Sequence, residues 1–105
     1  MTEILRGAVW RVPTVGRDRT VLVIQHNAVI AHHPGGIACV IVQEVENAPD
    51  TLLTIPIKYP VHGVVMASDI AQFRPVRFEQ GKFMGWLSSE DMERVSQAVR
   101  AALDL

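Results

Sequence analysis

The sequence predicts a mainly β protein, a small barrel or sandwich with one helix packed against it. Two observations support this. Short β-branched segments separated by Pro and Gly recur between Leu5 and Phe78, and one long amphipathic segment follows Ser88. A chain of 105 residues is long enough for one modest core and too short for two, so we expect a single domain over residues 1–105.

The composition is typical of a globular protein, with 49% hydrophobic and 20% charged residues. No apolar run approaches the roughly 18 residues needed to cross a membrane. The N-terminus has neither the basic region nor the long apolar region of a secretory signal. Cys39 is the single cysteine, which excludes a disulfide within the chain. We therefore expect a cytoplasmic protein without membrane partners.

The net charge of −1 does not favour a general affinity for duplex nucleic acid. The charge is uneven, however, because basic side chains outnumber acidic ones in residues 1–33 and the reverse holds in residues 34–105. This distribution is compatible with a local basic site in the N-terminal part.

The segment Leu5 to Gln25 predicts a β-hairpin. Residues 7–12 and 20–24 are rich in β-branched side chains, and residues 13–18 contain the Pro and Gly that predict a six-residue loop. Because arginines occupy this loop and its exits, we expect three guanidinium groups at one end of the sheet. They are Arg11, Arg17 and Arg19.

Four further strands are predicted, over residues 37–45, 51–57, 61–67 and 73–78. Pro56 and Pro75 indicate sheet edges or a bulge, because proline lacks the N–H that a central strand needs. Residues 28–33 predict either one helical turn or an irregular loop before Pro34.

The last element is a helix that runs to Leu105. Ser88 is a suitable N-cap, and acidic side chains follow it in the first turn, where they favour the positive end of the helix dipole. Helical spacing gives this segment one apolar face, made of Met92, Val95, Val99 and Leu103.

Four stretches carry a resemblance to a known family. Residues 5–10 (LRGAVW) resemble its opening R-G-[DE]-[IV]-[WY], and residues 19–25 (RTVLVIQ) resemble R-P-V-[LV]-[IV]-[IV]-[SQ]. Residues 69–76 and 85–88 resemble a later strand and the entry to the last helix. The family is the MazF/PemK toxin endoribonucleases of the CcdB/MazF superfamily. The resemblance implies an SH3-like small β-barrel with a C-terminal α-helix.

The resemblance also implies a function. The protein would be the toxin of a type II toxin–antitoxin pair, a metal-independent endoribonuclease that cleaves single-stranded RNA to 2′,3′-cyclic phosphate and 5′-hydroxyl ends. It would need no cofactor. It would be a homodimer with RNA across the dimer groove, inhibited by a cognate antitoxin whose acidic tail occupies that groove.

Cleavage of this kind needs a cation over the phosphate, a base for the 2′-hydroxyl and an acid for the leaving oxygen. We expect Arg19 to be the cation, Asp69 the base, and Arg74 a phosphate ligand or a partner of the acid. The alternatives are an exposed Arg19 paired with Asp18 and an Asp69 that only forms a turn. Candidate RNA contacts are Arg17, Gln43, Gln72, Thr20 and His26. The histidine spacings match no zinc pattern, so no metal site is expected.

Three positions depart from the family pattern. Thr20 stands where the family has Pro, Val42 where it has a Thr implicated in cleavage, and Met66 where the PemK-like branch has Arg. A valine cannot replace the hydrogen bonds of a hydroxyl. Two alternatives therefore stay open: a CcdB-like gyrase poison, and a binding protein of toxin fold without catalysis. The gyrase-poison alternative is less favoured because the sequence lacks the C-terminal Trp-Gly-Ile of CcdB.

Overall fold

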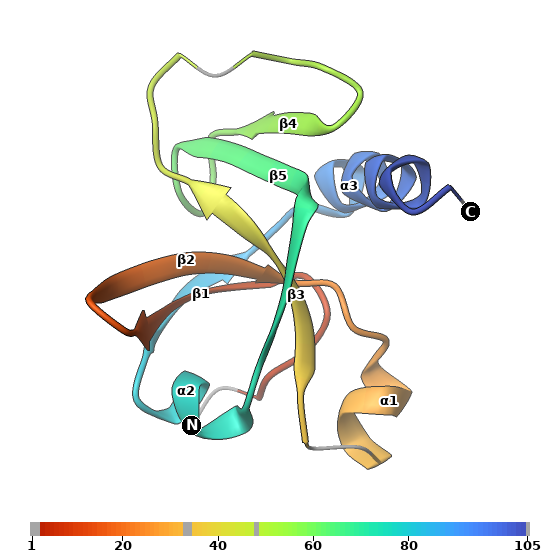
Figure 1. The fold of residues 1–105 in the computed structure, drawn as a ribbon. Helices are drawn as coiled ribbons and strands as arrows, with labels where there is room; N and C mark the ends of the chain where they lie inside the picture. Colours follow the sequence, from red (N-terminus) through yellow and green to blue (C-terminus); the bar gives the residue numbers. More distant parts are fainter. Residues whose placement is uncertain (1–2, 33–34, 48, 105) are drawn as a thin grey trace.

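The computed structural model describes residues 3–32, 35–47 and 49–104. It shows one strongly curved antiparallel sheet with a helix at the C-terminus, so the predicted mainly β fold is confirmed (Figure 1). The six strands lie in the order β4-β5-β3-β2-β1-β6. In chain order the elements are β1 (Ala8–Thr14), β2 (Arg17–Val23), α1 (Asn27–His32), β3 (Ile37–Gln43), β4 (Thr54–Ile57), β5 (Gly63–Phe73), α2 (Pro75–Glu79), β6 (Lys82–Trp86) and α3 (Ser89–Ala102).

A sharp bend in β5 gives the sheet much of its curvature. Val40 of β3 lies opposite Ile70, whereas the next residue, Ile41, lies opposite Met66. Residues 67–69 of β5 therefore have no partner in β3, and an unpaired insertion of this kind bends a strand. The bend is visible in Figure 1, where β5 passes from its pairing with β4 to a descending course beside β3.

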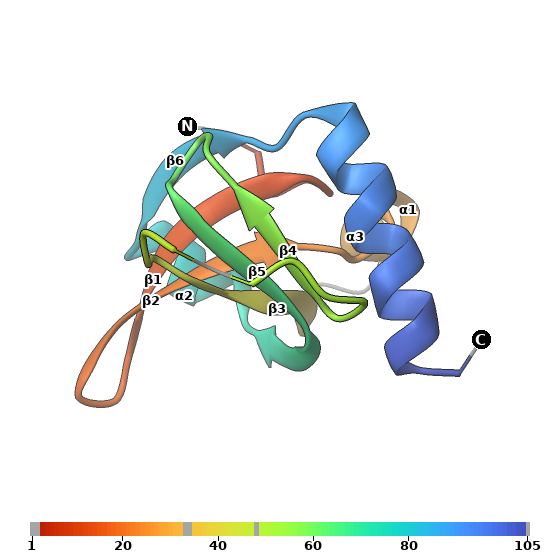
Figure 2. The same ribbon diagram turned by 90° about the horizontal axis from the view of Figure 1, so that it is seen from above.

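The sheet buries both of its faces. Side chains alternate between the faces along each strand, and they form two apolar clusters. One cluster, which includes Val9, Leu22 and Val40, packs against α3 through Val95. The second, which includes Trp10, packs against α2. Figure 2 shows α3 along one side of the curled sheet and the β1–β2 hairpin projecting beyond the opposite side.

The C-terminal helix begins as the sequence predicts. The hydroxyl of Ser88 accepts a 3.1 Å hydrogen bond from the backbone N–H of Asp91, and Glu90 and Asp91 lie in the first turn. Val95 and Ala98 are buried against the sheet. The helix ends at Ala102, before the predicted Leu105, which lies outside the described residues, and Leu103 is about half exposed.

The β1–β2 turn is shorter than predicted. Pro13 pairs with Asp18 and Thr14 pairs with Arg17, so a two-residue turn replaces the six-residue loop. Gly16 has a φ of +89°, a left-handed conformation that favours glycine in such turns. Pro13 is tolerated because the pairing of β1 with β6 has already ended at Arg11, where it faces Lys82.

The predicted strand over residues 73–78 is wrong, since β5 ends at Phe73 and Pro75 begins the short helix α2. Proline suits the first helical position, where its missing N–H would have no partner. Burial of Phe78, which is 1% exposed, fixes this turn against β1. The proline was therefore a helix start and not a mark of a sheet edge.

Other boundaries also differ from the prediction. Strand β4 covers only Thr54–Ile57, because residues 51–54 form a turn in which Thr51 N–H donates to the carbonyl of Thr54. Strand β5 runs from Gly63 to Phe73 instead of residues 61–67, and β3 ends at Gln43 instead of residue 45. Of the two alternatives for residues 28–33, the helix is correct up to His32, and His33 lies outside the described residues.

Candidate functional site

A pocket of about 360 Å³ opens where β2 begins, where β3 ends and where β5 bends. It brings together five of the eight residues predicted from the sequence. They are Arg17, Arg19, Thr20, Gln43 and Asp69. The other residues that line it are Asp18, Ile41, Val42, Glu44 and Val45.

A second hollow, of about 440 Å³, continues from this pocket along β5. Arg19, Ile41 and Asp69 line both hollows, and the second extends past Ile70 to Phe73. The two together form a trough with Arg19 and Asp69 where they meet. A trough of this kind is suited to an extended ligand rather than a compact one.

The arginines of the trough keep their guanidinium groups out of ion pairs within the described part of the chain. Within the described residues, neither Arg17 nor Arg19 forms an ion pair, and the alternative pairing of Arg19 with Asp18 is not present. Arg17 is exposed and Arg19 is half-buried, so both guanidinium groups remain available to an anion.

Arg11, the third arginine of the predicted cluster, is paired with a carboxylate of the protein. Arg11 donates from Nε to Oε2 of Glu44 at 3.2 Å, and Thr20 Oγ1 donates to the same oxygen at 2.6 Å. This pairing lowers the pKa of the Glu44 carboxyl and raises that of Arg11. Arg11 is therefore balanced by Glu44, and of the three arginines predicted to gather here, Arg17 and Arg19 have no ion-pair partner among the described residues.

Glu44 was missed from the sequence. It lies one residue beyond the end of β3, in a stretch that predicted strand and turn but no chemistry. The available signal was the alternation of side chains along a strand, which places Val40, Val42 and Glu44 on the same face of the sheet. Thr20 lies opposite Val42 and Arg11 opposite Thr20, which places both near Glu44.

The departures from the family pattern have clear structural settings. Val42 is 4% exposed and belongs to the apolar cluster beneath α3. Its neighbour across the strands, Thr20, is 7% exposed, and the Thr20 hydroxyl donates its proton to Glu44. Met66 lies opposite Ile41 and is half-buried.

Three predicted residues lie outside this pocket. Arg74 is the exposed N-cap residue of α2, and its side chain makes no capping bond. Gln72 lies opposite Ala38, toward the far end of β3. His26 lies before α1, where its Nδ1 accepts a 3.1 Å hydrogen bond from the N–H of Ala28. None of the three contributes to the lining around Arg19.

The described part of the chain contains neither a candidate metal-binding group nor a candidate membrane-spanning helix. No group of three or more His, Cys, Asp or Glu side chains there lies close enough to hold a metal ion. No helix there is long and apolar enough to cross a membrane, and the longest, α3, has 14 residues.

The fold is shared with solved structures of a known class of protein. An endoribonuclease from a mycobacterial species superposes with a TM-score of 0.83 at 21% identity, covering 100% of this chain and 95% of its own. A mycobacterial endoribonuclease in complex with its cognate antitoxin gives 0.80 at 21% identity, covering 98% and 97%. MazF in a MazE–MazF complex from Deinococcus radiodurans gives 0.79 at 16% identity, covering 100% and 99%. At these identities the likeness establishes the fold, that of MazF-like proteins.

The sequence identifies the family. A sequence profile of the PemK-like, MazF-like toxins of type II toxin–antitoxin systems matches residues 5–103. The chain therefore belongs to this toxin family, as the resemblance of the four stretches implied. No curated protein matches it in a sequence search.

Proposed function

We propose that this chain is the toxin of a type II toxin–antitoxin pair and that it cleaves single-stranded RNA without a metal. One observation carries the proposal: Arg17 and Arg19, which have no ion-pair partner among the described residues, share a trough with the carboxylate of Asp69. RNA is a polyanion, and guanidinium groups bind phosphate oxygens in pairs of hydrogen bonds. The structural neighbours named as endoribonucleases support the same function.

The proposed reaction is attack of an RNA 2′-oxygen on the adjacent phosphorus. Asp69 takes the proton of the 2′-hydroxyl, and the 2′-oxygen forms its bond to phosphorus while the bond to the 5′-oxygen breaks. Arg19 holds the phosphate oxygens and stabilises the charge that develops on them. The leaving 5′-oxygen takes a proton from water, which leaves a 2′,3′-cyclic phosphate and a 5′-hydroxyl.

The remaining trough residues are proposed to bind the RNA strand. Arg17 binds a neighbouring phosphate, and Gln43, exposed at the end of β3, hydrogen-bonds a base or sugar. Thr20 acts by holding Glu44 in place rather than by touching RNA. The predicted roles of Arg74, Gln72 and His26 stay predictions, because these side chains lie away from Arg19.

We further propose a cognate antitoxin and a homodimer. The toxins of the two neighbouring complexes bind antitoxins, called cognate in one and MazE in the other. An acidic antitoxin segment would compete with RNA for Arg17 and Arg19, because both ligands present negative charge to the same cations.

A catalytically inactive binding protein is the second candidate, and Val42 favours it. A buried valine supplies no hydroxyl at the position where the family has one. In that case the trough would bind RNA or antitoxin without cutting.

The test is incubation of purified protein with unstructured RNAs of varied sequence in EDTA. The proposal predicts fragments whose 5′ ends accept phosphate from a kinase directly and whose 3′ ends resist ligation until the cyclic phosphate is opened and the resulting phosphate is removed. Bound but intact RNA would favour the inactive binding protein. Intact RNA together with inhibition of gyrase supercoiling would favour the gyrase poison.

A further inference from the structure

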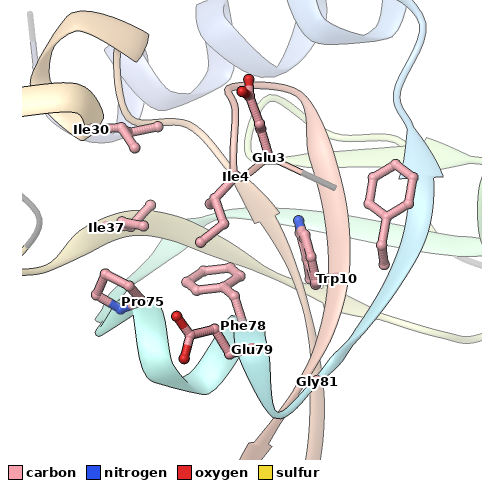
Figure 3. Close-up of a pocket in the computed structure, with 10 residues that line it drawn as sticks. Glu3, Ile4, Trp10, Ile30, Ile37, Pro75, Phe78, Glu79 and Gly81 are labelled. Atoms are coloured by element: carbon pink, nitrogen blue, oxygen red, sulfur yellow. The ribbon is translucent and has the colours of Figure 1, made fainter. Parts of the chain in front are cut away.

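A separate pocket of about 500 Å³ lies on the other face of the sheet, between β1, β6, α2 and the segment before β1 (Figure 3). It shares no lining residue with the trough around Arg19. Its volume is in the range of pockets that bind small molecules. The residues that matter here are Glu3, Ile4, Trp10, Phe78, Glu79 and Phe83.

Trp10 lines this pocket and carries a hydrogen-bond donor that the described part of the protein leaves unused. Its side chain is 6% exposed, and Nε1 is a buried polar atom that has no hydrogen-bond partner among the described residues. Edge-on contacts with Phe78 and Phe83, at centroid distances of 5.6 and 5.4 Å, hold the ring in place. Figure 3 shows the indole nitrogen on the ring edge toward Ile4 and Glu3.

A buried donor without an acceptor is costly, so an acceptor supplied by a ligand would be favourable. The pocket therefore combines apolar walls with a buried donor in one of its lining residues, and apolar walls with a few polar groups are the usual composition of a small-molecule site.

The charged residues that line the pocket have a single sign. Glu3 and Glu79 are both exposed, and neither forms an ion pair or a side-chain hydrogen bond with any described residue. Among the described residues, no Lys or Arg lines the pocket. A cationic ligand is complementary to this rim, whereas a phosphate or an RNA strand would be repelled.

We propose that this pocket binds a small organic cation with an apolar, preferably aromatic, body and a carbonyl group. The body packs against Trp10 and Phe78, the carbonyl oxygen accepts from Trp10 Nε1, and the cation lies near Glu3 or Glu79. This site is independent of the proposed RNA cleavage, because it shares neither residues nor charge sign with the trough.

Phenylalaninamide is a suitable probe because it combines a phenyl ring, an amide carbonyl and an ammonium group. Two related molecules separate the contributions: 3-phenylpropanamide keeps the ring and the carbonyl without charge, and N-acetylphenylalanine carries a negative charge instead. Binding is followed by the indole N–H signals in ¹H–¹⁵N spectra of the whole chain, which has two tryptophans. Substitution Trp10→Phe assigns them.

We expect phenylalaninamide to shift the Trp10 indole signal saturably, with a dissociation constant in the millimolar range that is typical of so small a ligand. Trp86, which is 45% exposed and does not line the pocket, should shift less. 3-Phenylpropanamide should bind about 3- to 10-fold more weakly, and N-acetylphenylalanine more weakly again. A lack of saturable shift at Trp10, or equal binding of the three molecules, would overturn the proposal.

Protein variants test the rim without disturbing the core. The double substitution Glu3→Gln with Glu79→Gln should bring phenylalaninamide and 3-phenylpropanamide to within about twofold of each other. The matched control Glu46→Gln, at an exposed carboxylate outside the pocket, should preserve the preference. An unchanged preference in the double variant would also refute the assignment of the cation to this rim.

Discussion

Thr20 and Glu44 are joined by a 2.6 Å hydrogen bond from the threonine Oγ1 to the glutamate Oε2. Because Arg11 binds the same carboxylate, the bond ties β1, β2 and the end of β3 together beside the trough. It also settles how charge is distributed there. Glu44 balances Arg11, while Arg17 and Arg19 have no ion-pair partner among the described residues.

Substitutions in this pair should change RNA affinity in opposite directions. Glu44→Gln removes a negative charge from the trough wall and should tighten binding, whereas Arg11→Ala leaves that charge unbalanced and should weaken it. We expect the dissociation constant for RNA to change about two- to fivefold in each direction at low salt, and the change to decrease as salt is added. Fluorescence anisotropy with an RNA lacking 2′-hydroxyls measures binding without cleavage. Changes in the same direction would contradict the assigned charge balance.

The same pair should make stability depend on pH. Arg11 lowers the pKa of Glu44 in the folded state, so its contribution is present above the unfolded value of about 4.3 and is lost as pH falls through the folded pKa. Since both side chains are more than a third exposed, solvent limits the contribution to about 1 kcal/mol or less.

Urea unfolding at pH 7 and pH 3 measures this effect. The free energy of unfolding should be higher for the native chain than for Glu44→Gln at pH 7, and the two should converge at pH 3. Glu46→Gln, at an exposed residue that forms no ion pair with any described residue, is the control that should match the native chain at both pH values. A difference in unfolding free energy between the native chain and Glu44→Gln that is larger at pH 3 than at pH 7 would contradict the predicted direction.

Cys39 should be inert in the folded protein. Burial in the apolar cluster around Trp10 raises the pKa of its thiol to about 12, so the reactive thiolate is absent at pH 8. An aromatic disulfide reagent should label it only as fast as the chain opens, and promptly in urea. Stability should fall as pH rises above the unfolded value of about 8.5, because only the unfolded thiol ionises there. Rapid labelling without denaturant would contradict this placement.

Restoring the family hydroxyl at position 42 should cost stability. Val42 is buried in the apolar cluster beneath α3, so Val42→Thr is expected to lower the free energy of unfolding by about 1–2 kcal/mol. Val45→Thr, at a residue that is 43% exposed, should cost less than about 0.5 kcal/mol. Equal effects in urea unfolding would mean that residue 42 is not packed as described.

Local signals in the sequence predicted the elements that depend on local physics. The start of α3 follows from Ser88, whose hydroxyl caps the helix, and the apolar run of β3 forms the strand it predicts. Helix α2 could not be predicted in this way. Its five residues are held by the burial of Phe78 against β1, which is a contact between distant parts of the chain.

In the candidate site, too, some residues could be predicted from local sequence and others depend on contacts between distant strands. Arg17 and Arg19 could be predicted because they lie at the start of a predicted strand, where the sequence resembles a family motif. Their meeting with Asp69 depends on the register shift between β3 and β5, and no local pattern encodes that shift. Glu44 was missed for a similar reason, since its partners Arg11 and Thr20 come from two other strands.

The most direct test of the proposed site is the rate of RNA cleavage by Arg19→Ala in EDTA. Arg100→Ala is the matched control, because Arg100 is exposed on α3 and does not line the trough. With both variants shown to be folded by their unfolding curves, we predict a loss of about 100-fold or more for Arg19→Ala and a native rate for Arg100→Ala. A native rate of cleavage by folded Arg19→Ala would place the reaction elsewhere in the protein.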